Sequence, residues 1–170
     1  FNGSLYKVNQ VHADVAASAE ADQPRLALDL TVLMWPYLGD TWVDDVDLRI
    51  GSYSEAIVQF DMGAGNVETP WQVGIHDLKA HVDANARLEI DLIEDWNNTA
   101  FLVEQGAFTG QGQIEIDLYA WDDYGIPSTF DLSAIDVSGF AGQLSLIGNK
   151  EGWGSYHNIG TVVGTDHGQT

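Results

Sequence analysis

Three hexapeptides of nearly the same pattern recur along this chain of 170 residues. They are Arg25–Leu30 (RLALDL), Arg87–Leu92 (RLEIDL) and Gln113–Leu118 (QIEIDL). Apolar and polar residues alternate in each, which is the pattern of a β-strand with one buried and one solvated face. The intervals between the copies are unequal, so they do not indicate the fixed period of a solenoid. We interpret them as three similar amphipathic strands whose carboxylates face water, with a duplicated strand-and-loop unit as the alternative.

The same alternation continues through most of the chain. The even-numbered residues from Leu26 to Met34 form one apolar face, and Leu28, Ile90 and Ile116 each lie in the middle of such a face. Clusters of Gly, Pro, Asp and Asn separate the alternating stretches, as turns separate the strands of sandwiches and barrels. We therefore predict one all-β domain over residues 1–170: an antiparallel β-sandwich of the jelly-roll or immunoglobulin-like kind, with a closed β-barrel as the alternative.

The charge balance is strongly acidic. The chain has 26 acidic residues against six basic ones, for a formal net charge of −20. Nucleic acid is excluded as a partner, because phosphate binding requires clustered Lys and Arg. We expect no membrane insertion, because no run approaches the roughly 20 apolar residues of a membrane helix. Cations are the natural counter-partners of this surface, although acidity also serves solubility in salty surroundings.

Several side chains have the chemistry of a calcium site. Asp44 and Asp45 lie close together in the sequence, as do Asp122 and Asp123 in a second predicted loop. Ca²⁺ takes six to eight oxygen ligands, and loops from several strands can supply them together. The spacing of an EF-hand loop is missing from the sequence. We predict Ca²⁺ at these four carboxylates, with a solvated polar face as the alternative.

Aromatic residues mixed with polar ones indicate a carbohydrate surface. An aromatic ring packs on the C–H face of a sugar, while carboxylates and amides bind its hydroxyl groups. The predicted ligand-binding residues lie in or beside predicted loops. They are Trp42, Trp96, Asn97, Trp121 and Tyr124.

Histidine and cysteine chemistry receives little support. His76 and His81 are five residues apart, which places them on opposite faces of a regular strand and makes no chelating pair. Cysteine is absent from the sequence, so disulfides, zinc–thiolate sites and cysteine catalysis are excluded.

No catalytic motif stands out. The sequence has no nucleophile elbow, no metalloprotease helix motif and no phosphate-binding loop. A carboxylate-based glycosidase stays open, but with 26 acidic residues the presence of carboxylate pairs carries almost no weight.

These patterns lead to two functional hypotheses. The first is a non-enzymatic module, extracellular or at the cell surface, that binds carbohydrate or another surface ligand through its loops with Ca²⁺ as a structural or bridging ion. The second is a structural subunit of an extracellular filament or surface layer, assembled by strand exchange through residues 5–15 or the tail after Gly160.

Overall fold

The computed structural model describes residues 1–6, 8–20, 22–34, 40–62, 71–94, 99–120, 128–148 and 159–163. The strands of these residues form two sheets. Sheet A contains, in spatial order, β1 (Asn2–Tyr6), β3 (Arg25–Leu33), β5 (Ser54–Asp61), β7 (Arg87–Glu94), β9 (Gln113–Ala120) and β12 (Gln143–Gly148). Sheet B contains β2 (Gln10–Val15), β4 (Thr41–Ile50), β6 (Trp71–Val82), β8 (Thr99–Gly110), β10 (Ser128–Asp131) and β13 (Ile159–Val163), and the short β11 (Ile135–Asp136) also pairs with β8.

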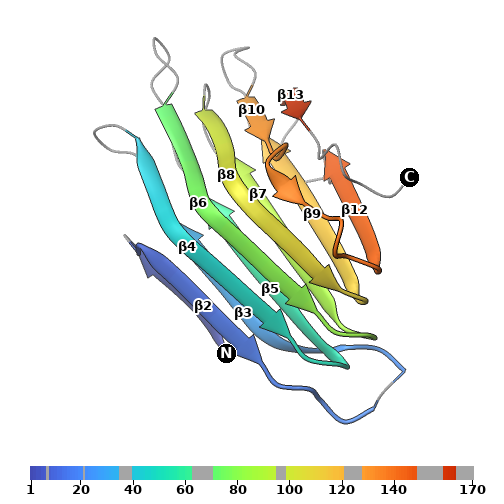
Figure 1. Ribbon diagram of the computed structural model, residues 1–170. Helices are drawn as coiled ribbons and strands as arrows, with labels where there is room; N and C mark the ends of the chain where they lie inside the picture. Colours follow the sequence, from blue (N-terminus) through green and yellow to red (C-terminus); the bar gives the residue numbers. More distant parts are fainter. Residues whose placement is uncertain are drawn as a thin grey trace.

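The chain winds as a parallel β-solenoid. Each strand crosses to the other sheet, and the chain then returns to lie beside the strand of the previous coil (Figure 1). Every pairing between the described strands is parallel, for example β3 with β5 and β4 with β6. The colours in Figure 1 therefore run in sequence order along the stack, from the blue N-terminal coil to the red C-terminal strands. No helix in the described part of the chain is long and apolar enough to cross a membrane.

The predicted antiparallel β-sandwich, and the closed β-barrel, are therefore wrong, although the all-β class is confirmed. The physical reason is that alternation reports which face of a strand is buried and not the direction of its neighbour. Parallel sheets are usually covered on both faces by helices. In this solenoid the opposite strand of each coil covers the inner face, so each sheet keeps an outward face and the alternating pattern.

The hexapeptides mark coils, contrary to the interpretation that they show no solenoid period. Residues 87–92 and 113–118 are aligned position by position in sheet A. The interval from Arg87 to Gln113 is one coil, whereas the interval from Arg25 to Arg87 contains two, because β5 lies between them. The sequence of β5 does not match the hexapeptide, and this hid the repeat.

The hydrophobic core lies between the two sheets. Leu28, Ile90 and Ile116 are buried, as predicted, and so are the even-numbered residues from Leu28 to Met34. Leu26 is exposed, contrary to the prediction for that face. The pairing of β3 with β5 shifts by one residue between Leu26 and Leu28, and a one-residue shift moves a side chain to the other face.

The connections that follow β4, β6 and β8 back to sheet A are short and stacked on one another. The first residue of each turn donates its N–H to the last part of the preceding coil's strand, as Asp83 does to Ile50 (2.9 Å) and Gln111 to Val82 (2.9 Å). Gly110, at the end of β8, has a φ of 105°. A Cβ atom added there would lie 2.1 Å from the carbonyl oxygen of Val82. Only glycine fits this position.

Replacement of Gly110 by alanine is expected to lower the free energy of unfolding by more than about 1–3 kcal/mol, the range for a strained backbone conformation alone. The contact with Val82 adds to this cost. The matched control is Gly139→Ala, because its Cβ would meet Thr109 Cγ2 at 3.3 Å, a contact that small movements relieve. Urea denaturation of both variants measures the difference, and equal midpoints would contradict the prediction.

Candidate functional site

The outward face of sheet B carries an irregularity that repeats in three neighbouring strands. In β4 two consecutive residues, Asp44 and Asp45, lie between the buried Val43 and Val46. The N–H groups of both aspartates donate to the carbonyl oxygen of Asn9, at 2.7 and 3.2 Å. Two N–H groups on one carbonyl are the signature of a β-bulge, which redirects side chains and is frequent beside functional sites.

The interruption falls at the same level in β6 and β8. There, His76 with Asp77 and Glu104 with Gln105 replace the regular alternation. Because the coils are stacked in register, one polar residue of each pair joins a row across three strands. This row consists of Asp44, His76 and Glu104.

An aromatic stack stands at this row. The rings of Trp42 and His76 are parallel to within 7°, with centroids 4.6 Å apart. His76 Nδ1 lies 2.7 Å from Glu104 Oε2, and Nε2 lies 3.9 Å from Asp44 Oδ1. The imidazole is thus held between two carboxylates at its edge and an indole on its face. We call these four residues, Trp42, Asp44, His76 and Glu104, the aromatic row.

Gly74 makes room for the indole. It pairs with Trp42 across β4 and β6, and a Cβ on Gly74 would lie 2.4 Å from Trp42 Cζ3. Trp42 therefore lies against the backbone of β6 and is half-buried. Part of the ring stays accessible at the outward face of sheet B.

The rest of this face carries ion pairs of ordinary surface type. His12 Nε2 lies 3.2 Å from Asp45 Oδ2, and Arg49 lies 3.6 Å from Asp47. Both pairs are partly exposed to solvent.

A further ion pair and a histidine complete this region. Lys79 pairs with Asp77, and this hydrogen bond raises the pKa of Lys79. His81 Nδ1 lies 2.9 Å from Thr109 Oγ1. Exposed pairs of this kind contribute little to stability.

The outward face of sheet A carries a second polar cluster, centred on one arginine. Arg87 Nη1 donates to Glu55 at 2.7 Å, and Nη2 lies 2.9 Å from Glu89 and 3.2 Å from Glu115. Burial by itself lowers the pKa of Arg87, but the charge of Glu89 and the hydrogen bond to Glu55 outweigh it and raise that pKa above its ordinary value. One guanidinium therefore bridges three adjacent strands.

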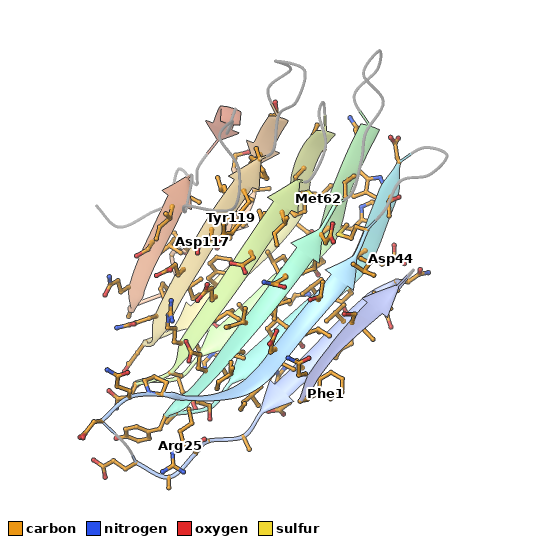
Figure 2. All side chains as sticks on the ribbon, turned by 180° about the vertical axis from the view of Figure 1, so that it is seen from behind. Phe1, Arg25, Asp44, Met62, Asp117 and Tyr119 are labelled. Carbon is orange, nitrogen blue, oxygen red and sulfur yellow. The ribbon has the colours of Figure 1, made fainter. Side chains whose placement is uncertain are left out.

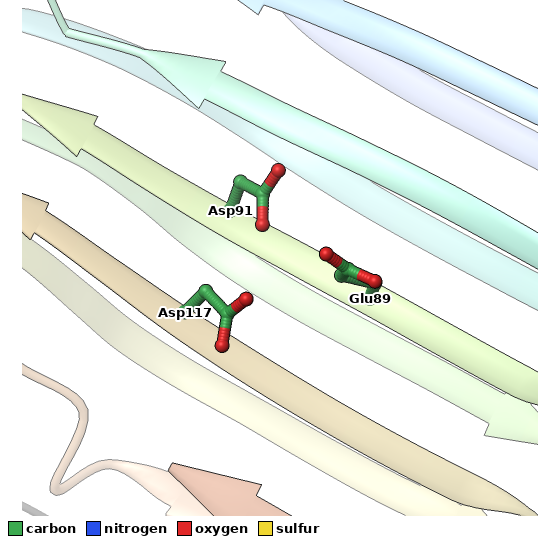
Figure 3. Close-up of side chains that lie close together, drawn as sticks. All are labelled: Glu89, Asp91 and Asp117. Atoms are coloured by element: carbon green, nitrogen blue, oxygen red, sulfur yellow. The ribbon is translucent and has the colours of Figure 1, made fainter. Parts of the chain in front are cut away.

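Three carboxylates follow along the same face. Figure 3 shows Glu89 and Asp91 on β7 and Asp117 on β9, and one oxygen atom of each lies within 4.8 Å of the others. Asp91 is 5% exposed and Asp117 is 0% exposed. Gln59 donates to Asp91 Oδ2 at 2.9 Å and accepts a hydrogen bond from Thr31 at 3.1 Å. We call Glu89, Asp91 and Asp117 the carboxylate trio.

The carboxylate trio has the donor chemistry for a hard divalent cation such as Ca²⁺. Among the described residues it is the group of acidic and histidine side chains close enough to share an ion. Acidic clusters are also common without an ion. The trio thus locates where a cation could bind on sheet A, and calcium binding itself stays a prediction.

The predicted site residues have different outcomes. Trp42 and Asp44 come together in the aromatic row. Asp45 lies against His12 on β2, on the other side of β4 from His76, whereas Asp44 lies on the side of His76. Calcium binding by Asp44 and Asp45 stays a prediction. The remaining predicted residues lie outside the described part of the chain; these are Trp96, Asn97, Trp121, Asp122, Asp123 and Tyr124.

Sequence reasoning missed two members of the aromatic row and the whole trio. His76 and His81 share the outward face, contrary to the prediction, because the bulge after His76 reverses the alternation. The repeated Glu-Ile-Asp of β7 and β9 was a usable signal for the trio, since similar hexapeptides are aligned in neighbouring coils of a solenoid. The prediction that these carboxylates face water is wrong for Asp91 and Asp117, which are buried.

Comparison of the chain with models of protein families, with curated proteins and with solved structures found no match. The residues of the site are therefore interpreted by their geometry and chemistry alone.

Proposed function

We propose that this protein is a non-enzymatic binding module, extracellular or at the cell surface, whose ligand is a neutral carbohydrate bound at the aromatic row. The observation that carries the proposal is the Trp42–His76 stack between Asp44 and Glu104 on the outward face of sheet B. The β-solenoid replaces the β-sandwich of the sequence hypothesis, and the ligand class is unchanged.

The chemistry of the row suits a sugar. A sugar ring has apolar C–H faces and a rim of hydroxyl groups, so an indole contacts the faces while carboxylates accept hydrogen bonds from the rim. Trp42 and Asp44 lie on β4, His76 lies on β6 and Glu104 lies on β8, and strands hold side chains more rigidly than loops do. This lowers the entropic cost of binding.

The charge of the protein supports a neutral ligand. With a net charge of −20, the surface repels acidic polysaccharides and attracts any polycation irrespective of its shape. A neutral polymer distinguishes binding at the aromatic row from nonspecific attraction to the acidic surface, because its binding depends on contacts and not on charge. Suitable probes are soluble linear glucans, xylans and mannans.

Calorimetric titration with these three probes tests the proposal. We expect at least one to bind, with an affinity that about 1 M NaCl leaves nearly unchanged because contacts of this kind are not screened. Trp42→Ala should weaken binding by about 30-fold or more, the loss for a binding hot spot of about 2 kcal/mol. His76→Ala should weaken binding by a smaller factor, because this change removes the imidazole ring that stacks on Trp42 but leaves the indole itself.

The matched control is His81→Ala. His81 lies on the same strand and the same face as His76, but outside the aromatic row, where it contacts Thr109 and Asp83. Its replacement should leave the affinity unchanged. The proposal fails if none of the three polymers binds, or if Trp42→Ala and His81→Ala have equal affinities while both variants melt as the parent protein does.

A further inference from the structure

In the described part of the chain, the first coil has two open sheet edges beside an apolar groove. Within the described residues β1 pairs with β3 and β2 pairs with β4, so each has one neighbour and one open edge. A groove runs between these strands. Its apolar lining includes Phe1, Leu5, Val11, Ala13, Val15, Leu28 and Leu30. Figure 2 shows Phe1, which is exposed, beside the terminal strands.

The C-terminal end has the complementary form. β12 is the last described strand of sheet A, and it pairs in parallel with β9. Leu144 and Leu146 occupy the inward positions, opposite the buried Ile114 and Ile116. Leu146 nevertheless is 45% exposed. In sheet B the last described strand is β13, which pairs in parallel with β10.

We propose that copies of this chain associate head to tail, so that β1 and β2 of one copy continue the two sheets beyond β12 and β13 of the next. An open edge of a parallel sheet is completed by a strand that runs in the same direction. A partner for this end must supply two such strands at the separation of the two sheets, with apolar residues facing inward. The opposite end of the same molecule supplies two such strands, β12 in sheet A and β13 in sheet B.

The consequence is an open assembly. A head-to-tail contact uses two different surfaces, so each added copy presents a new open end, and the contact forms a filament unless a rotation closes a ring. The charge of −20 on each copy opposes this contact. Salt screens that repulsion, because the Debye length falls to about 3 Å at 1 M. Assembly should therefore increase with both protein concentration and NaCl, and it does not depend on carbohydrate binding.

Sedimentation velocity of the unmodified protein is the first test. Over a concentration series in about 1 M NaCl, we expect species larger than a monomer whose size grows with concentration. A monomer at every concentration and at both low and high salt overturns the proposal, and another partner would then cover these ends.

Two variants then test the direction of the contact. Ala13→Lys places a charge at an inward position of β2, and Leu146→Lys does the same on β12; inward-pointing charge on an edge strand is a natural barrier to pairing. Each variant alone should stay monomeric. A 1:1 mixture should form a heterodimer and nothing larger, because one copy keeps its C-terminal end and the other keeps its N-terminal end.

The controls change neighbouring outward residues. Asp14→Asn changes the charge of β2 by the same amount as Ala13→Lys, and Ser145→Lys introduces the same side chain as Leu146→Lys on the opposite face of β12. Both should assemble as the parent protein does. If Ala13→Lys does not fold, Val15→Lys on the same face replaces it. Dimers of a single blocked variant, or a mixture that stays monomeric, would overturn the head-to-tail arrangement.

Discussion

Replacement of Ile90 by alanine is expected to lower the free energy of unfolding by about 2–5 kcal/mol. Ile90 lies on β7, with β5 and β9 on either side, and its side chain is buried opposite Val58 and Ile116. The neighbouring coils hold the backbone on both sides, so little relaxation can fill the cavity that the change leaves. The measurement is urea denaturation followed by circular dichroism.

Ile57→Ala is the matched control for this change. Ile57 lies on β5, in the coil next to Ile90, but its side chain is on the outward face and only half-buried. The same deletion of methyl and methylene groups should cost less than about 1 kcal/mol there. Equal costs at the two positions would show that the assigned inner and outer faces of sheet A are wrong.

Replacement of Arg87 by methionine is expected to cost about 2–4 kcal/mol. The side chain keeps its apolar length but loses the charge that contacts Glu55, Glu89 and Glu115. Removal of one partner from a buried ion pair costs about 3–5 kcal/mol, and we take a lower range because Arg87 is 30% exposed. Glu89 also belongs to the carboxylate trio, so the loss of the guanidinium charge leaves Glu89 beside Asp91 and Asp117 and increases the repulsion between carboxylates.

The raised pKa of Arg87 fixes the pH dependence of this cost. A group whose pKa is raised in the folded state stabilises fully below its unfolded pKa and loses that contribution only as the pH rises through the folded value. Since the ordinary pKa of arginine is above about 12, the cost of Arg87→Met should not decrease between about pH 7 and about pH 10. Denaturation at these two pH values measures it.

Arg49→Met is the control for the arginine prediction. Arg49 is 64% exposed and pairs with Asp47 at 3.6 Å on the outward face of sheet B. A surface pair contributes about 0–1 kcal/mol, so this change should be nearly neutral. Comparable losses in the two variants would show that the cluster around Arg87 does not behave as a partly buried network.

The two polar clusters lie on opposite outward faces of the solenoid, and this separation helps the functional tests. The aromatic row lies on sheet B, while Arg87 and the carboxylate trio lie on sheet A. Variants of one face therefore act as controls for the other. A loss of carbohydrate binding in Arg87→Met without loss of folded protein would indicate that sheet A takes part in the ligand site.

The sequence by itself determined the all-β class and, for most of the strands that it indicated, which face is buried. Leu28, Ile90 and Ile116 are buried as expected. These conclusions succeed because a strand with one buried face must alternate every two residues, and that pattern is local to the strand. Nothing beyond the segment itself is required to detect it.

Only the tertiary structure decided how the strands pair and what their outward faces carry. Strands that are neighbours in a sheet are not consecutive in the chain, so their parallel pairing is a contact between residues far apart in the sequence. No local pattern of residues indicates this pairing. One bulge shared by three strands brings His76 and Glu104 to Trp42 and places His76 and His81 on the same face. Asp91 and Asp117 meet because their hexapeptides stack in register. The local alternation of residues indicates to which face of its strand a side chain points. The side chains that it contacts on the adjacent strands depend on the register between coils, which is a non-local property of the fold.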